Sequence, residues 1–156
     1  MKITFLGTGT SQGVPVIACD CETCRSEDPR DKRLRTSLLI ENEETTLVID
    51  AGPDFRQQML RANVGKLDSI ILTHEHKDHI AGMDDVRAFN YRTRDAIDIY
   101  AEERVQKAVR REFSYVFAEH QYPGVPKMRL FDIPAYGFEV KSIKLIPIRV
   151  FHYRLP

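Results

Sequence analysis

The sequence of 156 residues contains no tryptophan, only three cysteines, and no apolar run of transmembrane length. The cysteines are crowded at Cys19, Cys21 and Cys24, and an odd number in one cluster does not fit a disulfide framework. The first residues lack the layout of a signal peptide. We therefore expect a cytoplasmic protein, without a membrane partner, whose thiols stay reduced.

An excess of charge of either sign is also absent. Lysine plus arginine and aspartate plus glutamate number 23 each, so the formal net charge is zero. This balance argues against a nucleic-acid-binding tail, although it leaves room for a local basic patch. The length allows one domain or part of one, and a hydrophobic fraction of 42% is enough for a globular core.

The hydrophobic pattern alternates between strand-like and helix-like segments. Helical spacing predicts helices over residues 55–62, with Asp54 as the N-cap, and over 102–113, while 83–90 should begin as a short helix with Arg87 and Asn90 on the side of the site. Short apolar runs predict strands at 2–7, 36–41, 45–50, 68–73, 97–100, 128–133, 138–140 and 143–151. The expected fold class is α/β.

The most informative segment follows the strand at 68–73, where three histidines and an aspartate lie within six positions. His74 and His76 alternate, so an extended segment points both imidazoles to the same side. Asp78 and His79 follow where the chain turns into a helix. This layout suits two adjacent metal ions, one on the histidine pair and one on Asp78 and His79, with zinc, manganese or iron as the candidates. The alternative is a polar surface loop.

The three cysteines form a second candidate metal site. Thiolates in the pattern Cys-x-Cys-x-x-Cys favour a structural zinc with four protein ligands. The cysteines account for three of them, and His120 is a weak candidate for the fourth. Three free thiols in a mobile loop are the alternative interpretation.

The run Thr73-His-Glu-His-Lys-Asp-His-Ile-Ala-Gly82 resembles the signature of the metallo-β-lactamase fold hydrolases. Residues 1–15, with their glycine-rich turn, resemble the phosphodiesterase branch of that family. The cysteine cluster resembles a subset of the branch that includes the cyclic phosphodiesterase of carbon–phosphorus lyase pathways and the pyrroloquinoline-quinone biosynthesis protein B. Residues 47–55 resemble the strand end of the family that bears an aspartate.

The resemblance implies an αββα sandwich, of which residues 1–156 would be the N-terminal portion of a single domain. It implies His152 as the third ligand of the first metal, and Asp50 as a carboxylate that braces the metal loop through hydrogen bonds. Relatives supply a bridging aspartate, a further histidine and the fourth cysteine-site ligand from later positions. Half a sandwich would leave a sheet face uncovered, so we expect pairing with a second copy, as a homodimer, or with a C-terminal partner.

The activity implied is hydrolysis of a small or cyclic nucleotide-like phosphodiester by a two-metal-activated hydroxide, with Asp78 as the catalytic carboxylate. Arg87 is a candidate for binding the substrate phosphate, and a solvated helix charge is the alternative. Two other functions stay open: a ribonuclease Z-like RNA endonuclease, disfavoured by the neutral charge, and a metal-binding domain without turnover. A role in cofactor biosynthesis is a third.

Overall fold

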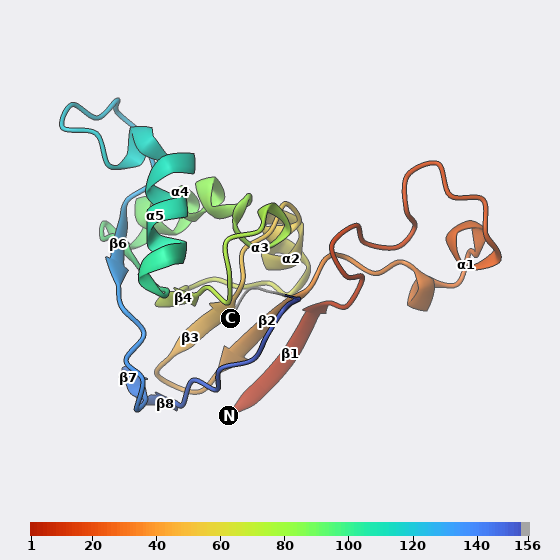
Figure 1. The fold of residues 1–156 in the computed structure, drawn as a ribbon, viewed down its shortest axis with the longest axis horizontal. Helices are drawn as coiled ribbons and strands as arrows, with labels where there is room; N and C mark the ends of the chain where they lie inside the picture. The colour runs from red at the N-terminus through yellow and green to blue at the C-terminus, as the bar shows by residue number, and fades with distance from the viewer. Residues whose placement is uncertain (154–156) are drawn as a thin grey trace.

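The computed structural model describes residues 1–153 (Figure 1). Its strands are β1 (Lys2–Gly7), β2 (Ser37–Glu41), β3 (Thr46–Ile49), β4 (Ser69–Ile71), β5 (Ile97–Tyr100), β6 (Met128–Phe131), β7 (Phe138–Val140) and β8 (Ile143–Leu145). The α-helices are α1 (Glu22–Arg25), α2 (Phe55–Arg61), α3 (Lys77–Ile80), α4 (Arg87–Thr93) and α5 (Glu103–Glu112), and the short 3-10 turns are η1 (Pro29–Asp31), η2 (Met83–Val86) and η3 (Ser114–Val116).

Six strands form one mixed sheet in the sequential order β1 to β6. The pairs β1–β2 and β2–β3 are antiparallel, whereas β3, β4, β5 and β6 run parallel. Parallel neighbours need crossover connections, and the helices α2 to α5 provide them. In Figure 1 these helices lie on one side of the sheet and the β7–β8 hairpin lies away from them. The predicted α/β class is confirmed.

The two faces of the sheet are covered unequally. Between the sheet and the helices lies the main core, in which Phe55, Leu72, Met83 and Val105 are almost fully buried. The other face carries a smaller cluster, closed by the β7–β8 hairpin. On β1 this face is open, because Ile3 and Phe5 are more than half exposed. That a second copy or a partner chain covers this face stays a prediction.

Within residues 1–153, no helix has both the length and the apolar character needed to cross a membrane. Helix α5 has a two-sided pattern: it buries Val105, Ala108 and Val109, whereas most of its charged residues are exposed. This spacing places the buried residues on one stripe of the helix, which packs on the sheet.

Three sequence-based expectations need correction. The last predicted strand is short: only residues 143–145 pair, and Ile146, Ile148 and Val150 follow as exposed chain outside any strand. Residues 15–34, whose lack of a helical or strand period predicts a loop, contain α1 and η1, and this segment extends away from the body of the molecule (Figure 1). Asp54 precedes α2 but makes no capping hydrogen bond; its carboxylate instead accepts from the backbone N–H and the guanidinium of Arg35.

Asp68 connects the β7–β8 hairpin to the start of β3, and it should make the stability of the fold depend on pH. Its carboxylate accepts the N–H of Thr46 at 2.8 Å and pairs with Lys66 and Lys141. Burial disfavours the charged form, but these partners outweigh burial and lower the pKa of Asp68 below 3.8. A lowered pKa stabilises the fold above pH 3.8, and the contribution disappears as the pH falls through the folded-state pKa. Denaturant unfolding of the wild type and Asp68→Asn from pH 7 to pH 2 should show a difference that vanishes at the acid end.

Candidate metal centre

The candidate site lies where two neighbouring parallel strands end. Asp50 follows β3 and His74 follows β4 by three residues, and the register pairs Ile49 with Ile71. The carboxyl ends of parallel strands meet at one edge of the sheet, which is the common position of sites in such folds. The sheet therefore brings together two segments that are 24 positions apart in sequence (50 to 74).

Asp50 organises this edge. The residue is 3% exposed and its backbone is left-handed, with φ of 63°. One carboxylate oxygen accepts the N–H of Thr73 at 2.8 Å, and the other accepts the Thr73 hydroxyl at 2.8 Å and lies 2.7 Å from His79 Nδ1. The Ser37 hydroxyl donates to the carbonyl of Asp50 at 2.8 Å. A single buried carboxylate thus holds both ends of the metal-site loop.

Three imidazoles lie close together at this edge of the sheet. The ligand nitrogens of His74, His76 and His152 lie within 4.8 Å of one another. His74 Nε2 is 3.1 Å from His76 Nδ1, and the His152 ring centroid lies 5.1 Å and 5.3 Å from those of His74 and His76. The strand expected before His152 is absent, yet the exposed chain still brings His152 to the other two rings.

The protonation of His74 suits a ligand. Burial, helped by the neighbouring imidazole of His79, lowers the pKa of His74. Because the Thr73 hydroxyl already donates to Asp50, its oxygen can accept a hydrogen bond from the Nδ1–H group of His74, and the two atoms lie 3.0 Å apart. Such a tautomer leaves a lone pair on Nε2, the nitrogen that faces His76.

His79 joins the cluster from α3. Its ring centroid lies 3.9 Å from that of His74, and its Nε2 is 3.2 Å from a carboxylate oxygen of Asp78. Burial works against a charged ring, but the hydrogen bond and charge of Asp50 outweigh it and raise the pKa of His79. The pair Asp78 and His79 therefore lies next to the three imidazoles, with the second ring nitrogen of His79 held by Asp50.

The donor set fits a divalent cation. Zinc–nitrogen bonds of 2.0–2.1 Å in a tetrahedron place two ligand nitrogens about 3.4 Å apart, close to the separation of the His74 and His76 nitrogens. A histidine that ligates a metal usually gives its other ring N–H to a carboxylate, as Asp50 allows for His79. The arrangement can hold a metal, and imidazole with carboxylate does not distinguish zinc from manganese or iron.

The cysteines form a separate group. The sulfurs of Cys19, Cys21 and Cys24 lie within 4.8 Å of one another, and the N–H of Val16 donates to Cys24 Sγ at 3.3 Å. The backbone N–H of Cys24 is the main cause that lowers the pKa of the Cys21 thiol. Among residues 1–153 the group contains only these three ligands, so His120 is not brought to it.

Two other residues have different surroundings from those expected. Arg87 pairs with Asp84 at 2.7 Å and is half-exposed, so its role in binding a phosphate stays a prediction. Asn90 was expected on the side of the site, and this is wrong: its amide is buried and donates to the carbonyls of Asp95 and Lys127. Its bonds fix the end of α4 to the chain before β6.

Sequence reasoning missed the residues that position the histidines and are not themselves candidate metal ligands. The Thr73 hydroxyl links Asp50 to His74, and the Gly52 backbone lies against that of Asp78. Both residues stand inside the segments that carried the family resemblance, which was the available signal.

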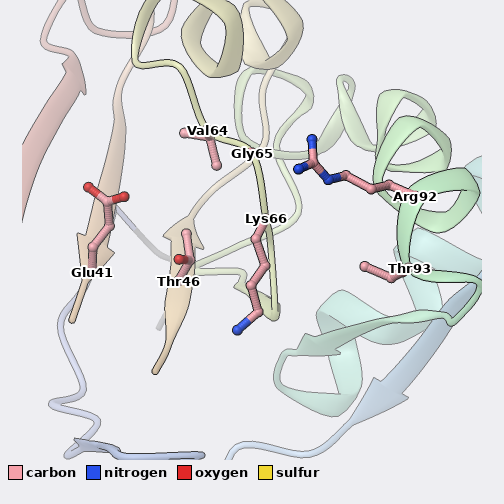
Figure 2. Close-up of a pocket in the computed structure, with 7 residues that line it drawn as sticks. All are labelled: Glu41, Thr46, Val64, Gly65, Lys66, Arg92 and Thr93. Atoms are coloured by element: carbon pink, nitrogen blue, oxygen red, sulfur yellow. The ribbon is translucent and has the colours of Figure 1, made fainter. Parts of the chain in front are cut away.

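A surface hollow of about 530 Å³ lies elsewhere on the molecule (Figure 2). It is lined by Glu41, Thr46, Val64, Gly65, Lys66, Arg92 and Thr93. Thr46 begins β3 and Lys66 precedes β4, so the hollow lies at the amino ends of these strands, opposite the histidines. In Figure 2 the Arg92 guanidinium points toward Gly65. The hollow is therefore not part of the candidate metal centre.

This arrangement of a mixed sheet, helices on one face and a histidine–aspartate cluster at the strand ends defines a metallo-β-lactamase-type domain. The model of the β-lactamase superfamily domain matches residues 45–156, and the chain belongs to this family. It is 45% identical, over its whole length, to a Porphyromonas gingivalis protein named octanoyltransferase, of which it covers 32%.

Two solved structures share the fold. A diphosphatase of the PhnP family superposes with a TM-score of 0.85 at 38% identity, over 96% of this chain and 57% of that one. The zinc-bound PqqB of Methylobacterium extorquens superposes with a TM-score of 0.69 at 22% identity, over 90% of this chain and 48% of that one. The predicted resemblance to the phosphodiesterase branch and to the quinone-biosynthesis protein is confirmed, and the chain spans about half the length of these structures.

Proposed function

We propose that this chain carries the metal-binding part of a hydrolase that cleaves a phosphodiester or diphosphate bond in a small substrate. The observation that supports this most is the convergence of three imidazoles beside a carboxylate–histidine pair. The likeness to a PhnP-family diphosphatase, at 38% identity, favours a phosphorus-centred substrate.

The proposed roles of the residues follow from their contacts. His74, His76 and His152 would hold one metal, and Asp78 with His79 would hold a second. Asp50 orients the ring of His79, and the Thr73 hydroxyl orients that of His74. Bound divalent ions would supply Lewis-acid activation of a water and of the substrate phosphate. The lowered pKa of His74 keeps its ring neutral and able to donate a lone pair at neutral pH.

The octanoyltransferase name of the P. gingivalis relative points to a different reaction. This chain matches only 32% of that protein, and the name does not say which part acts on the acyl group. A cluster of histidines and aspartate at the strand ends is a ligand set for a hydrolytic metal centre. We therefore assign the phosphoester chemistry, and not acyl transfer, to this segment.

The proposal predicts that the histidine and cysteine groups bind metal separately. Elemental mass spectrometry should find metal in the wild type and less metal per chain in His74→Ala/His76→Ala. Replacing Cys19, Cys21 and Cys24 by serine should remove the remainder. The matched control is His120→Ala, because His120 is an exposed histidine outside both groups and should leave the metal content unchanged.

Turnover separates the competing functions once metal is bound. Hydrolysis of bis(p-nitrophenyl) phosphate or of a dinucleoside diphosphate, without cleavage of precursor tRNA, would support the proposal. Cleavage of the RNA alone would favour the ribonuclease alternative. A metal-loaded chain that cleaves neither substrate would be a binding domain. Equal metal content in the wild type and the histidine variant would refute the proposed site.

A further inference from the structure

Helix α5 is tied to both segments that carry the imidazole cluster. Arg104 Nη1 lies 3.2 Å from Glu75 Oε1, and Glu112 pairs with Lys77, so two ion pairs reach the loop of His74 and His76. At the N-terminal end of the helix, near Arg104, the N-cap residue Glu102 accepts from Arg149 at 3.0 Å, and Arg149 lies three positions before His152. One helix therefore contacts the chain on both sides of the candidate site.

Glu75 is the most informative of these contacts. It stands between His74 and His76 in an extended segment, where successive side chains point in opposite directions. The imidazoles face the cluster, and the carboxylate faces α5. Its side chain is only 22% exposed, and Arg104 is its only ion-pair partner among residues 1–153. A carboxylate in this position needs a cation, because burying an unpaired charge is costly.

The Glu75 carboxylate is also incompletely satisfied. Its Oε2 atom is buried and accepts no hydrogen bond from the described residues. A partly buried ion pair of this kind adds little net stability, and its best-attested use is to specify one geometry. Glu75 is therefore better suited to fixing the loop that carries His74 and His76 than to stabilising the fold. The contribution of α5 to the core comes from Val105, Ala108 and Val109.

We propose that Arg104 is a positioning residue of the metal centre: by holding Glu75, it sets the direction in which His74 and His76 present their ring nitrogens. This inference rests on the proposed function, since it assumes that the two rings bind metal. It goes beyond the ligands themselves and assigns α5 a role as the support of the histidine loop. Arg104 does not contact the substrate in this proposal, and it acts on the histidines through Glu75.

The test compares Arg104→Met and Glu75→Gln with the wild type. Zinc affinity, measured by competition with a chromophoric chelator, should fall about 10- to 100-fold in both variants, the usual effect of losing a residue that orients a ligand. Arg104→Lys keeps the charge and should recover part of the affinity. The double variant should bind zinc no more weakly than either single variant, because each change breaks the same contact between Arg104 and Glu75.

The matched control is Lys107→Met on the same helix. Lys107 pairs with Glu103 at 2.6 Å, but both side chains are more than 70% exposed and neither reaches the histidine loop. This variant should keep the zinc affinity of the wild type. Because the control removes a positive charge of the same helix, it separates the contact with Glu75 from a general change of charge.

A second measurement does not depend on metal. In the metal-free chain, hydrogen exchange of residues 73–82 should be faster in Arg104→Met and Glu75→Gln than in the wild type, and unchanged in Lys107→Met. Unchanged exchange and unchanged zinc affinity in both loop variants would overturn the role of Arg104. Faster exchange in a protein whose wild type binds no zinc would instead support the positioning contact and refute the proposed function.

Discussion

Gly52→Ala is expected to cost about 3 kcal/mol of stability and to abolish the metal binding that we propose at the histidines. A Cβ at position 52 would lie 1.9 Å from the carbonyl oxygen of Asp78, a backbone atom that cannot move alone. Two backbone hydrogen bonds hold the segments of Gly52 and Asp78 together. The N–H of Ala51 donates to the His79 carbonyl at 2.8 Å, and the N–H of Gly82 donates to the Ala51 carbonyl at 2.9 Å. Relieving the clash must therefore displace the loop that carries Asp78 and His79.

The matched control for this change is Gly65→Ala. A Cβ at position 65 would meet only the far end of the Arg92 side chain, at 3.9 Å, so the change should be neutral or slightly stabilising. Denaturant unfolding gives the free energy for both variants, and elemental analysis gives the metal per chain. Gly82→Ala should behave like Gly52→Ala, because its Cβ would lie 2.0 Å from the Gly52 carbonyl oxygen. Wild-type stability and metal content in Gly52→Ala would show that the two segments are not held together in this way.

The sequence predicted most of the strands because their signals are local. The hairpin of β2 and β3 and the strand β5 follow from short apolar runs. The alternation of His74 and His76 predicted that both rings point to the same side of the chain. Neighbours along the chain determine these features, so a single sequence is enough to predict them.

The features that were mispredicted depend on partners far away in sequence. Asp54 stands where an N-cap is expected, but Arg35, nineteen positions earlier, takes its carboxylate. Helical spacing placed Asn90 on the same side as the site, but its side-chain amide donates to the carbonyl of Lys127, far away in sequence. Residues 146–151 alternate like a strand, and no neighbouring strand pairs with them among the described residues. Tertiary contacts override local propensity at Asp54 and Asn90, whereas residues 146–151 lack the neighbouring strand that they would need.

Glycine shows why part of the site was beyond this kind of reasoning. Gly52 and Gly82 do not need a positive φ, so no local backbone rule identifies them. Their role is to let two backbone segments approach, and that requirement appears only when both segments are in place. The same holds for the Asp50 carboxylate, which contacts residues 23 and 29 positions away.

Asp50→Asn should leave the fold intact and weaken binding of the second metal, which we propose at Asp78 and His79. Asparagine tolerates the left-handed backbone at position 50, so the turn should survive. Asp50 accepts at both oxygens, from the Thr73 N–H and hydroxyl and from His79 Nδ1. An amide has one accepting oxygen, and its NH₂ group must face some of these donors.

The consequence for His79 follows from its two ring nitrogens. If the new NH₂ group donates to Nδ1, the ring proton moves to Nε2, the nitrogen that faces Asp78 and would bind the metal. We therefore expect the affinity of this second metal to fall at least 10- to 100-fold. Nitrogen-15 chemical shifts of the imidazoles report the tautomer directly, and calorimetric titration with zinc reports each binding step. Asp68→Asn is the control, because it removes a buried carboxylate at the opposite end of β4 and should lower stability without changing either binding step. Two unchanged zinc sites in Asp50→Asn, with His79 still protonated at Nδ1, would contradict the role of Asp50 as the residue that sets the tautomer.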